Sequence, residues 1–125
     1  MKKQTTKKTI KSSVKTKRSP VTTHVLNTAT GAPEKGIDVL LLRHQSGGAE
    51  LIARRLTNED GRIEDFLPPD MKLPAGVYIL NFDLSQHKDC FFPEVQVSFK
   101  VDGKRGHYHV PLLLSPYGYA TYRGS

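Results

Sequence analysis

Histidines are the residues of this sequence with the clearest capacity for proton transfer or metal binding. His107 and His109 are two positions apart in the strand-like run "HYHVPLLL", so their side chains are expected on one face, with Cα atoms about 6.5–7 Å apart. Such a pair, joined by a third histidine such as His24 in "VTTHVLN", is a known zinc geometry that leaves a position open for water. The other interpretation is ordinary surface or core-edge histidines, and spacing alone does not decide between the two.

A single arginine follows an Asp-Gly turn in "TNEDGR". A tight turn can present the guanidinium of Arg62 rigidly at the end of a sheet, where paired donors suit a planar, oxygen-rich anion. Alternatively, the turn makes a hairpin and Arg62 is a solvated residue beside it. The motif by itself favours the second interpretation.

The C-terminal run is unusually rich in aromatic residues for a chain end. Tyr117, Tyr119, Tyr122, Arg123 and Ser125 occur within nine residues. A buried tyrosine brings a large apolar area and a hydroxyl that needs a partner. We therefore expect this run to pack, against its own domain or against a neighbouring subunit.

Other routes to catalysis have little support in the sequence. Cys90 has His87 nearby, but a nucleophilic cysteine needs its base placed in space, and nothing in the sequence indicates that placement. The chain has no G-x-S-x-G elbow, no Gly-rich phosphate loop and no C-x-x-C motif. A single cysteine excludes an internal disulfide and fits a reducing compartment.

These residues must be positioned by strands. "FFPEVQVSFKV" alternates apolar and polar residues with the period of a half-buried strand, and "GIDVLLLRH", "GVYILNF" and "ELIARRLT" are bounded by turn signals. "DLSQHKDCF" is predicted to form a short helix, with Asp83 or Ser85 as its N-cap. The pattern predicts an antiparallel β-sandwich with little helix.

Charge divides the 125-residue chain into two parts. Residues 1–20 carry eight basic and no acidic side chains, which leaves 11 basic and 12 acidic residues in 21–125 although the whole chain has a formal charge of +7. We expect 1–20 to be a disordered basic tail, since its few apolar residues cannot offset the entropy of ordering, and 21–125 to be one domain. The nearly neutral domain argues against specific nucleic-acid binding. No stretch is apolar enough for a membrane span or a secretory signal, which favours the cytoplasm.

Four blocks in order carry a family resemblance: "TTHVLNTATGAP", "TNEDGR", "FFPEVQVSF" and the terminal "HYHVPLLLSPYGYATYRGS". Over residues 21–125 the chain resembles the 5-hydroxyisourate hydrolases, the transthyretin-like enzymes of urate breakdown. The ending "YRGS" distinguishes those enzymes from transthyretin, their hormone-carrying relative. Ala120 stands where the family usually has serine, outside the residues assigned to chemistry.

The resemblance implies an all-β, transthyretin-like antiparallel sandwich of two four-stranded sheets with one short helix. It also implies a homotetramer with active sites in the channel where two dimers meet. The implied reaction is cofactor-independent hydrolysis of 5-hydroxyisourate, which opens the six-membered ring at a cyclic amide C–N bond and gives 2-oxo-4-hydroxy-4-carboxy-5-ureidoimidazoline.

The resemblance further assigns roles to matching positions. His24, Arg62, His109 and Ser125 are the implied catalytic residues, and His24, Arg62 and Tyr122 are the implied substrate contacts. Tyr122 and Ser125 would form the wall and floor of the pocket. His24 and His109 would handle the protons, in either order as base and acid.

Two alternative functions follow from the same residues. One is a transthyretin-like carrier of a small aromatic ligand, although His24, Arg62 and His109 would make its channel polar. The other is a zinc-dependent hydrolase that uses His24, His107 and His109 as metal ligands.

Overall fold

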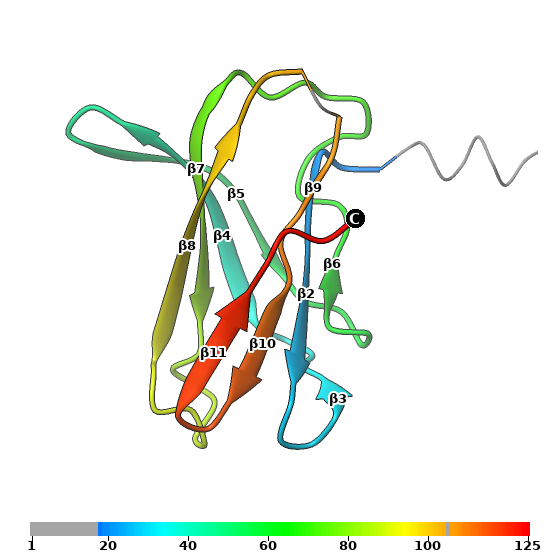
Figure 1. Ribbon diagram of the computed structural model, residues 1–125, viewed down its shortest axis with the longest axis vertical. Coiled ribbons are helices and arrows are strands. Elements are labelled where there is room, and N and C mark those ends of the chain that lie inside the picture. Colours follow the sequence, from blue (N-terminus) through cyan, green and yellow to red (C-terminus); the bar gives the residue numbers. More distant parts are fainter. Residues whose placement is uncertain (1–17, 105) are drawn as a thin grey trace, which may run out of the picture.

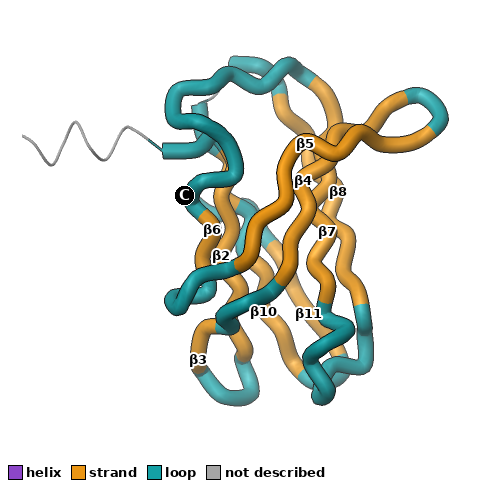
Figure 2. The backbone as a smooth tube through the Cα atoms, turned by 180° about the vertical axis from the view of Figure 1, so that it is seen from behind, coloured by secondary structure: helices purple, strands orange, loops and turns teal. Residues whose placement is uncertain are grey.

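The computed structural model describes residues 18–104 and 106–125, and these form two sheets packed face to face (Figures 1 and 2). The four-stranded sheet has the order β5-β4-β7-β8, and the other sheet has the path β11-β10-β2-β3, with β6 and β9 also paired to β2. The strands are β2 (Val21–Asn27), β3 (Ala32–Pro33), β4 (Asp38–Gln45), β5 (Gly48–Leu56), β6 (Arg62–Ile63), β7 (Gly76–Asp83), β8 (Glu94–Val101), β9 (Tyr108–His109), β10 (Leu112–Ser115) and β11 (Gly118–Thr121).

The four-stranded sheet confirms the strands predicted from the sequence. β4, β5, β7 and β8 pair antiparallel in long, nearly regular ladders, with one register shift between Leu41 and Leu42. Along β8, Val95 and Val101 are buried and the polar residues between them are exposed. The period of two therefore identified both the strand and its buried face.

The second sheet differs from the expectation in two ways. It has six strands, because β6 and β9 are separate two-residue pairings on the N-terminal half of β2 (Figure 1). It is also not wholly antiparallel, since β9 and β10 both run parallel to β2. β9 and β10 follow each other along β2 and are separated at Pro111, because proline has no N–H to donate to the ladder.

Alternating residues of the two sheets meet in the core. β2 and β10 contribute Val21, Val25, Leu112 and Leu114, while β4, β7 and β8 contribute Val39, Leu41, Tyr78, Leu80, Phe82 and Val95, all essentially buried. Because the inward face of β2 is fixed by this core, its outward face has a fixed register as well.

The predicted helix at "DLSQHKDCF" is wrong. Within the described residues the structure contains no helix, and this segment forms two turns closed by bonds from His87 N to Leu84 O (2.9 Å) and from Cys90 N to His87 O (3.1 Å). Asp83 does accept bonds from the backbone and hydroxyl of Ser85, as a cap would. Leu84 N, however, donates to Pro93 O, so the segment is a loop that joins β7 to β8.

The chain is bonded to the fold from Ser19 and Pro20, just before β2. Ser19 is 1 % exposed, and its hydroxyl donates to Val21 O and accepts from Leu67 N. Pro20 is buried, and its carbonyl accepts from Tyr108 N. Of the predicted tail over residues 1–20, positions 1–17 lie outside the described residues, whereas Ser19 and Pro20 are packed against the domain. In the described part of the chain, no helix is long and apolar enough to cross a membrane.

Candidate active site on the outward face of β2

Four polar residues meet on the outward face of β2. In the register of the sheet, His24 is paired with Arg62 of β6, and Thr22 is paired with His109 of β9. Thr22 and His24 are two positions apart on one strand, and cross-strand partners project from the same face, so the four side chains share that face. Three of the residues predicted to act in catalysis are thus brought together from distant parts of the sequence.

A tight turn fixes the position of Arg62. The side-chain carbonyl of Asn58 accepts from the backbone N–H groups of Asp60 and Arg62, at 2.8 and 3.0 Å. Gly61 has a φ of 72°, and a Cβ there would lie 2.5 Å from the carbonyl oxygen of Val25. Only glycine suits this backbone and this close approach to β2, so the backbone from which Arg62 projects is rigidly placed.

The chain end is anchored to the backbone of His109. Gly124 N donates to His109 O at 2.8 Å, and the two residues form an isolated antiparallel bridge. A Cβ on Gly124 would lie 2.4 Å from Cδ2 of the His109 ring, so the ring occupies the space that a side chain would fill. Figure 1 shows the C-terminal end beside β9, which agrees with the expectation that it packs.

Tyr122 and Ser125 lie on either side of this anchor. Tyr122 is 56 % exposed and Ser125 is also exposed. Between them, the guanidinium of Arg123 lies 4.7 Å from the centre of the Tyr108 ring and donates to His107 O at 3.3 Å. The tip of the chain is therefore held next to β9 while these two side chains stay open to another molecule.

Burial and positive charge keep the site histidines neutral. Burial lowers the pKa of His24, and Arg62 lowers it further, against a backbone hydrogen bond and carboxylate charge from Asp60 and the carboxylate of Glu64. Burial also lowers the pKa of His109, followed by the charge of Arg62 and smaller effects of His24 and Arg18, against the carboxylate of Glu64. Both imidazoles are thus available as proton acceptors near pH 7.

Thr22 is a member of the site that the sequence predictions omitted. It is 3 % exposed, and its Oγ1 lies 2.7 Å from Nδ1 of His109 and 3.0 Å from Nε2 of His107. The signal was present in "TTH", because a residue two positions before His24 on a strand must share its face.

His107 has a different role from the one that the zinc alternative requires. Its ring stacks on that of His109 with centroids 6.2 Å apart, and burial, then Arg18, His109 and Arg123, lower its pKa to about 4. Among the described residues, no group of three or more His, Cys, Asp or Glu side chains is arranged to hold a metal ion. His24, His107 and His109 therefore do not form the predicted ligand set.

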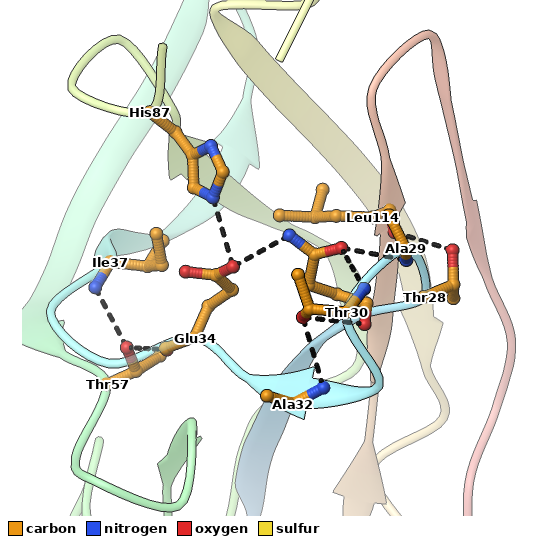
Figure 3. A network of polar contacts seen from close by, with 10 residues as sticks. Thr28, Ala29, Thr30, Ala32, Glu34, Ile37, Thr57, His87 and Leu114 are labelled. Carbon is orange, nitrogen blue, oxygen red and sulfur yellow. Dashed lines mark hydrogen bonds and ion pairs between the residues drawn. The ribbon is translucent and has the colours of Figure 1, made fainter. Parts of the chain in front are cut away.

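A second polar cluster, which contains one histidine, lies at the other end of β2 (Figure 3). We call Asn27, Glu34 and His87 the loop cluster: one carboxylate oxygen of Glu34 accepts from Nδ2 of Asn27 at 2.9 Å and contacts Nε2 of His87 at 3.0 Å. Cys90 lies nearby, and burial, with the charges of Glu34 and Asp89, raises its pKa. A protonated thiol is a poor nucleophile, so this cluster lacks the features of a cysteine hydrolase site.

Comparisons with known proteins cover nearly the whole described chain. The model of the HIUase/Transthyretin family matches residues 21–124. The curated 5-hydroxyisourate hydrolase of Halalkalibacterium halodurans is 41 % identical over 115 residues, covering 84 % of this chain and 97 % of that protein.

Two solved structures extend this similarity to the fold. The 5-hydroxyisourate hydrolase of Klebsiella pneumoniae superposes with a TM-score of 0.72 at 35 % identity, covering 86 % of this chain and 99 % of that one. Transthyretin from Sparus aurata superposes with a TM-score of 0.76 at 26 % identity, covering 86 % and 97 %. The predicted transthyretin-like β-sandwich is confirmed.

Proposed function

Since the chain belongs to the HIUase/Transthyretin family, we propose that it hydrolyses 5-hydroxyisourate in urate degradation and that the outward face of β2 is its active site. Relatives named as 5-hydroxyisourate hydrolases, from bacteria and from mouse, are each 41 % identical to this chain. The observation that carries the site assignment is the pairing of His24 with Arg62 beside His109, on one face of one sheet.

His24 and His109 act as the proton-handling pair. One neutral imidazole takes a proton from water as the water oxygen bonds to the ring carbonyl carbon. The imidazolium formed in this way supplies that proton, directly or through the second imidazole, to the ring nitrogen as the C–N bond breaks, so the ring-opened product gains a carboxyl group and an N–H and both imidazoles end neutral. A positioned acid or base of this kind contributes about 10²–10⁴-fold to a rate.

Arg62 has two roles in this mechanism. Its charge helps keep both imidazoles neutral, as the direction of the pKa changes of His24 and His109 requires. Its guanidinium can also bind the substrate oxygens with paired donors and stabilise the negative charge that develops on the attacked carbonyl oxygen. Tyr122 would contact the flat substrate and Ser125 would close the site.

A homotetramer would complete the site. On one chain, His24, Arg62 and His109 are only partly buried, and Tyr117, Tyr119 and Tyr122 are 83, 45 and 56 % exposed. Exposed aromatic residues of this density favour an interface. Sedimentation velocity tests this part of the proposal, which expects a single species of four chains. The predicted cytoplasmic location stays a prediction.

The carrier alternative requires an apolar pocket, whereas this face carries two neutral imidazoles and a guanidinium. The test of the proposed function is the decay of freshly generated 5-hydroxyisourate, followed with and without purified protein. We expect the full chain to accelerate the decay of 5-hydroxyisourate, and a variant that lacks residues 122–125 to accelerate it much less. If the full chain does not accelerate decay of 5-hydroxyisourate but binds an iodinated aromatic compound saturably, the carrier would be favoured instead.

A further inference from the structure

The Thr22 hydroxyl lies between two histidine rings in a nearly closed environment. The side chain is 3 % exposed, and Oγ1 is 2.7 Å from Nδ1 of His109 and 3.0 Å from Nε2 of His107. The two rings are almost parallel, with an interplanar angle of 12°. These distances are those of hydrogen bonds on both sides of one hydroxyl.

We propose that Thr22 and His107 are positioning residues for the hydrolysis, and that the Thr22 hydroxyl couples the tautomer of His109 to that of His107. This inference rests on the proposed function, because it concerns a residue assigned there to proton transfer. Neither Thr22 nor His107 is expected to touch the substrate.

Counting protons restricts the arrangements that make both bonds. A hydroxyl has one proton to donate, and a buried one is expected to donate it. If Thr22 donates to Nδ1 of His109, it accepts from Nε2–H of His107. If it donates to Nε2 of His107, it accepts from Nδ1–H of His109. Both neutral rings therefore carry their proton on Nε2 in the first case and on Nδ1 in the second.

The two tautomers are consequently coupled. Because Nδ1 of His109 is bonded to Thr22, Nε2 is its only ring nitrogen available to another molecule. The arrangement with the proton on Nδ1 of both rings leaves a lone pair on that nitrogen, as a base requires. The arrangement with the proton on Nε2 makes the same nitrogen a hydrogen-bond donor, which can orient the substrate or the attacking water but cannot accept a proton.

The surroundings of His107 suit a neutral orienting group. Burial, then the charges of Arg18, His109 and Arg123, lower its pKa to about 4, so a positive charge is not readily transferred to it. His107 can change tautomer at neutral pH without becoming charged. It therefore orients the Thr22 hydroxyl instead of acting as a store for the proton.

The tautomers can be read directly by long-range ¹H–¹⁵N correlation spectra of the full-length protein at pH 7.5, assigned with His107→Gln and His109→Gln. We expect both neutral rings to carry the proton on the same type of nitrogen. Thr22→Val keeps the shape of the side chain but removes the hydroxyl, so it should change the tautomer signature of both rings, and Thr22→Ser should restore it. A wild-type spectrum with opposite tautomers would overturn the inference.

A matched control lies one residue along the strand. Thr23 is also fully buried, and its hydroxyl donates to Val110 O at 2.6 Å on the core face of β2. Thr23→Val removes a buried hydroxyl as well, so it should lower the melting temperature but leave the tautomers of His107 and His109 unchanged. This control separates the specific effect of Thr22 from a general loss of stability.

Turnover provides the second readout. We expect Thr22→Val to lower kcat for 5-hydroxyisourate by about tenfold or more, part of what one positioned base contributes, with KM changed less than kcat. His107→Gln, whose amide oxygen can still accept from Thr22, should retain more activity than His107→Phe. If wild type is active while Thr22→Val and His107→Phe stay within about twofold of it, this inference fails and the proposed function stands. An inactive wild type would instead overturn the proposed function, and the spectra would still test the coupling of the rings.

Discussion

The strand β2 (Val21–Asn27) takes part in two histidine-containing clusters of opposite electrostatic character. On its outward face, His24 and His109 lie near the positive charge of Arg62, and the pKa of each is lowered. At its C-terminal end, in the loop cluster, His87 contacts a carboxylate oxygen of Glu34 at 3.0 Å. The pKa of Glu34 is lowered: burial would raise it, but hydrogen bonds from His87 and Asn27 outweigh burial.

The difference shows how the neighbouring charge sets the state of each histidine near pH 7 in this molecule. A cation next to an imidazole disfavours its protonated form, so a ring nitrogen keeps a free lone pair. A carboxylate next to an imidazole favours an ion pair, and in the loop cluster this contact engages the ring nitrogen Nε2 of His87. The loop cluster joins the segment after β3 to the loop between β7 and β8 (Figure 3). We therefore expect substitutions in the first cluster to affect turnover and those in the second to affect stability.

The largest expected effect separates the two clusters with one kind of substitution. His24→Gln and His109→Gln should each lower kcat/KM for 5-hydroxyisourate by about 10²–10⁴-fold, the contribution of a general acid or base. His87→Gln should leave kcat/KM within about threefold of wild type, because its ring belongs to the loop cluster. Initial rates of substrate decay measure all three variants.

Circular dichroism and melting temperature provide the control for folding. A folded His109→Gln variant with wild-type turnover would contradict the assignment of the site. A His87→Gln variant that loses turnover as strongly as His24→Gln would remove the distinction between the clusters.

Arg62 should have the next largest effect. Arg62→Gln removes both the charge beside the imidazoles and the paired donors for the substrate, so we expect kcat/KM to fall about 10²-fold. Arg54→Gln is the matched control, since Arg54 is exposed and pairs with Asp38 at 2.7 Å in the other sheet. Equal activities of the two variants would argue against a role for Arg62.

A smaller effect is expected where the chain end meets His109. Gly124→Ala would place a Cβ 2.4 Å from Cδ2 and 3.2 Å from Cγ of the His109 ring, so the ring or the chain end must shift. Because small displacements of catalytic groups are costly, we expect a loss of about tenfold to a hundredfold in kcat/KM. Gly106→Ala, which meets no atom within 4 Å, should be neutral, and equal effects of the two would contradict this contact.

The smallest effect on turnover is expected in the loop cluster. Glu34→Gln should lower the free energy of unfolding by about 1–2 kcal/mol at pH 7, since it weakens charge-assisted hydrogen bonds from His87 and Asn27. The pKa of Glu34 lies below its ordinary value of 4.5 in the folded protein. Its contribution is therefore complete above that value and is lost as the pH falls through the folded pKa.

Denaturant unfolding at several pH values checks this prediction. The difference between wild type and Glu34→Gln should shrink on acidification, while turnover at pH 7 stays close to wild type. A difference that is independent of pH would show that the charge of Glu34 is not what stabilises the cluster.

The sequence predicted the elements of the fold better than their pairing. Alternation identified β8, and Asp-Gly identified the turn before Arg62, because both signals are local, although the turn motif by itself favoured a solvated Arg62. The parallel pairing of β2 with β9 joins residues 21–22 to 108–109, and no local pattern encodes a contact over that separation. The family resemblance, not spacing, supplied the convergence of His24, Arg62 and His109.

The predictions that the structure overturned also have specific physical causes. "DLSQHKDCF" has a capping residue, but its two turns are tied to the neighbouring strands, and tertiary bonds such as Leu84 N to Pro93 O prevailed over local propensity. His107 shares a face with His109 as predicted, yet its Nε2 contacts Thr22. A strand pattern gives the face of a side chain but not the partner of each ring nitrogen.

The central claim, that neutral histidines beside Arg62 carry out the proton transfers, is tested most directly by the pH dependence of kcat/KM for wild type and Arg62→Gln. Burial and Arg62 lower the pKa values of His24 and His109 below 6.5, so the wild-type profile should be level near pH 7 and fall only below pH 6.5. In Arg62→Gln the residual activity should begin to fall at a higher pH, because the charge that opposes protonation is gone. A wild-type profile that already falls above pH 6.5, or an acid limb that does not move in Arg62→Gln, would contradict the account.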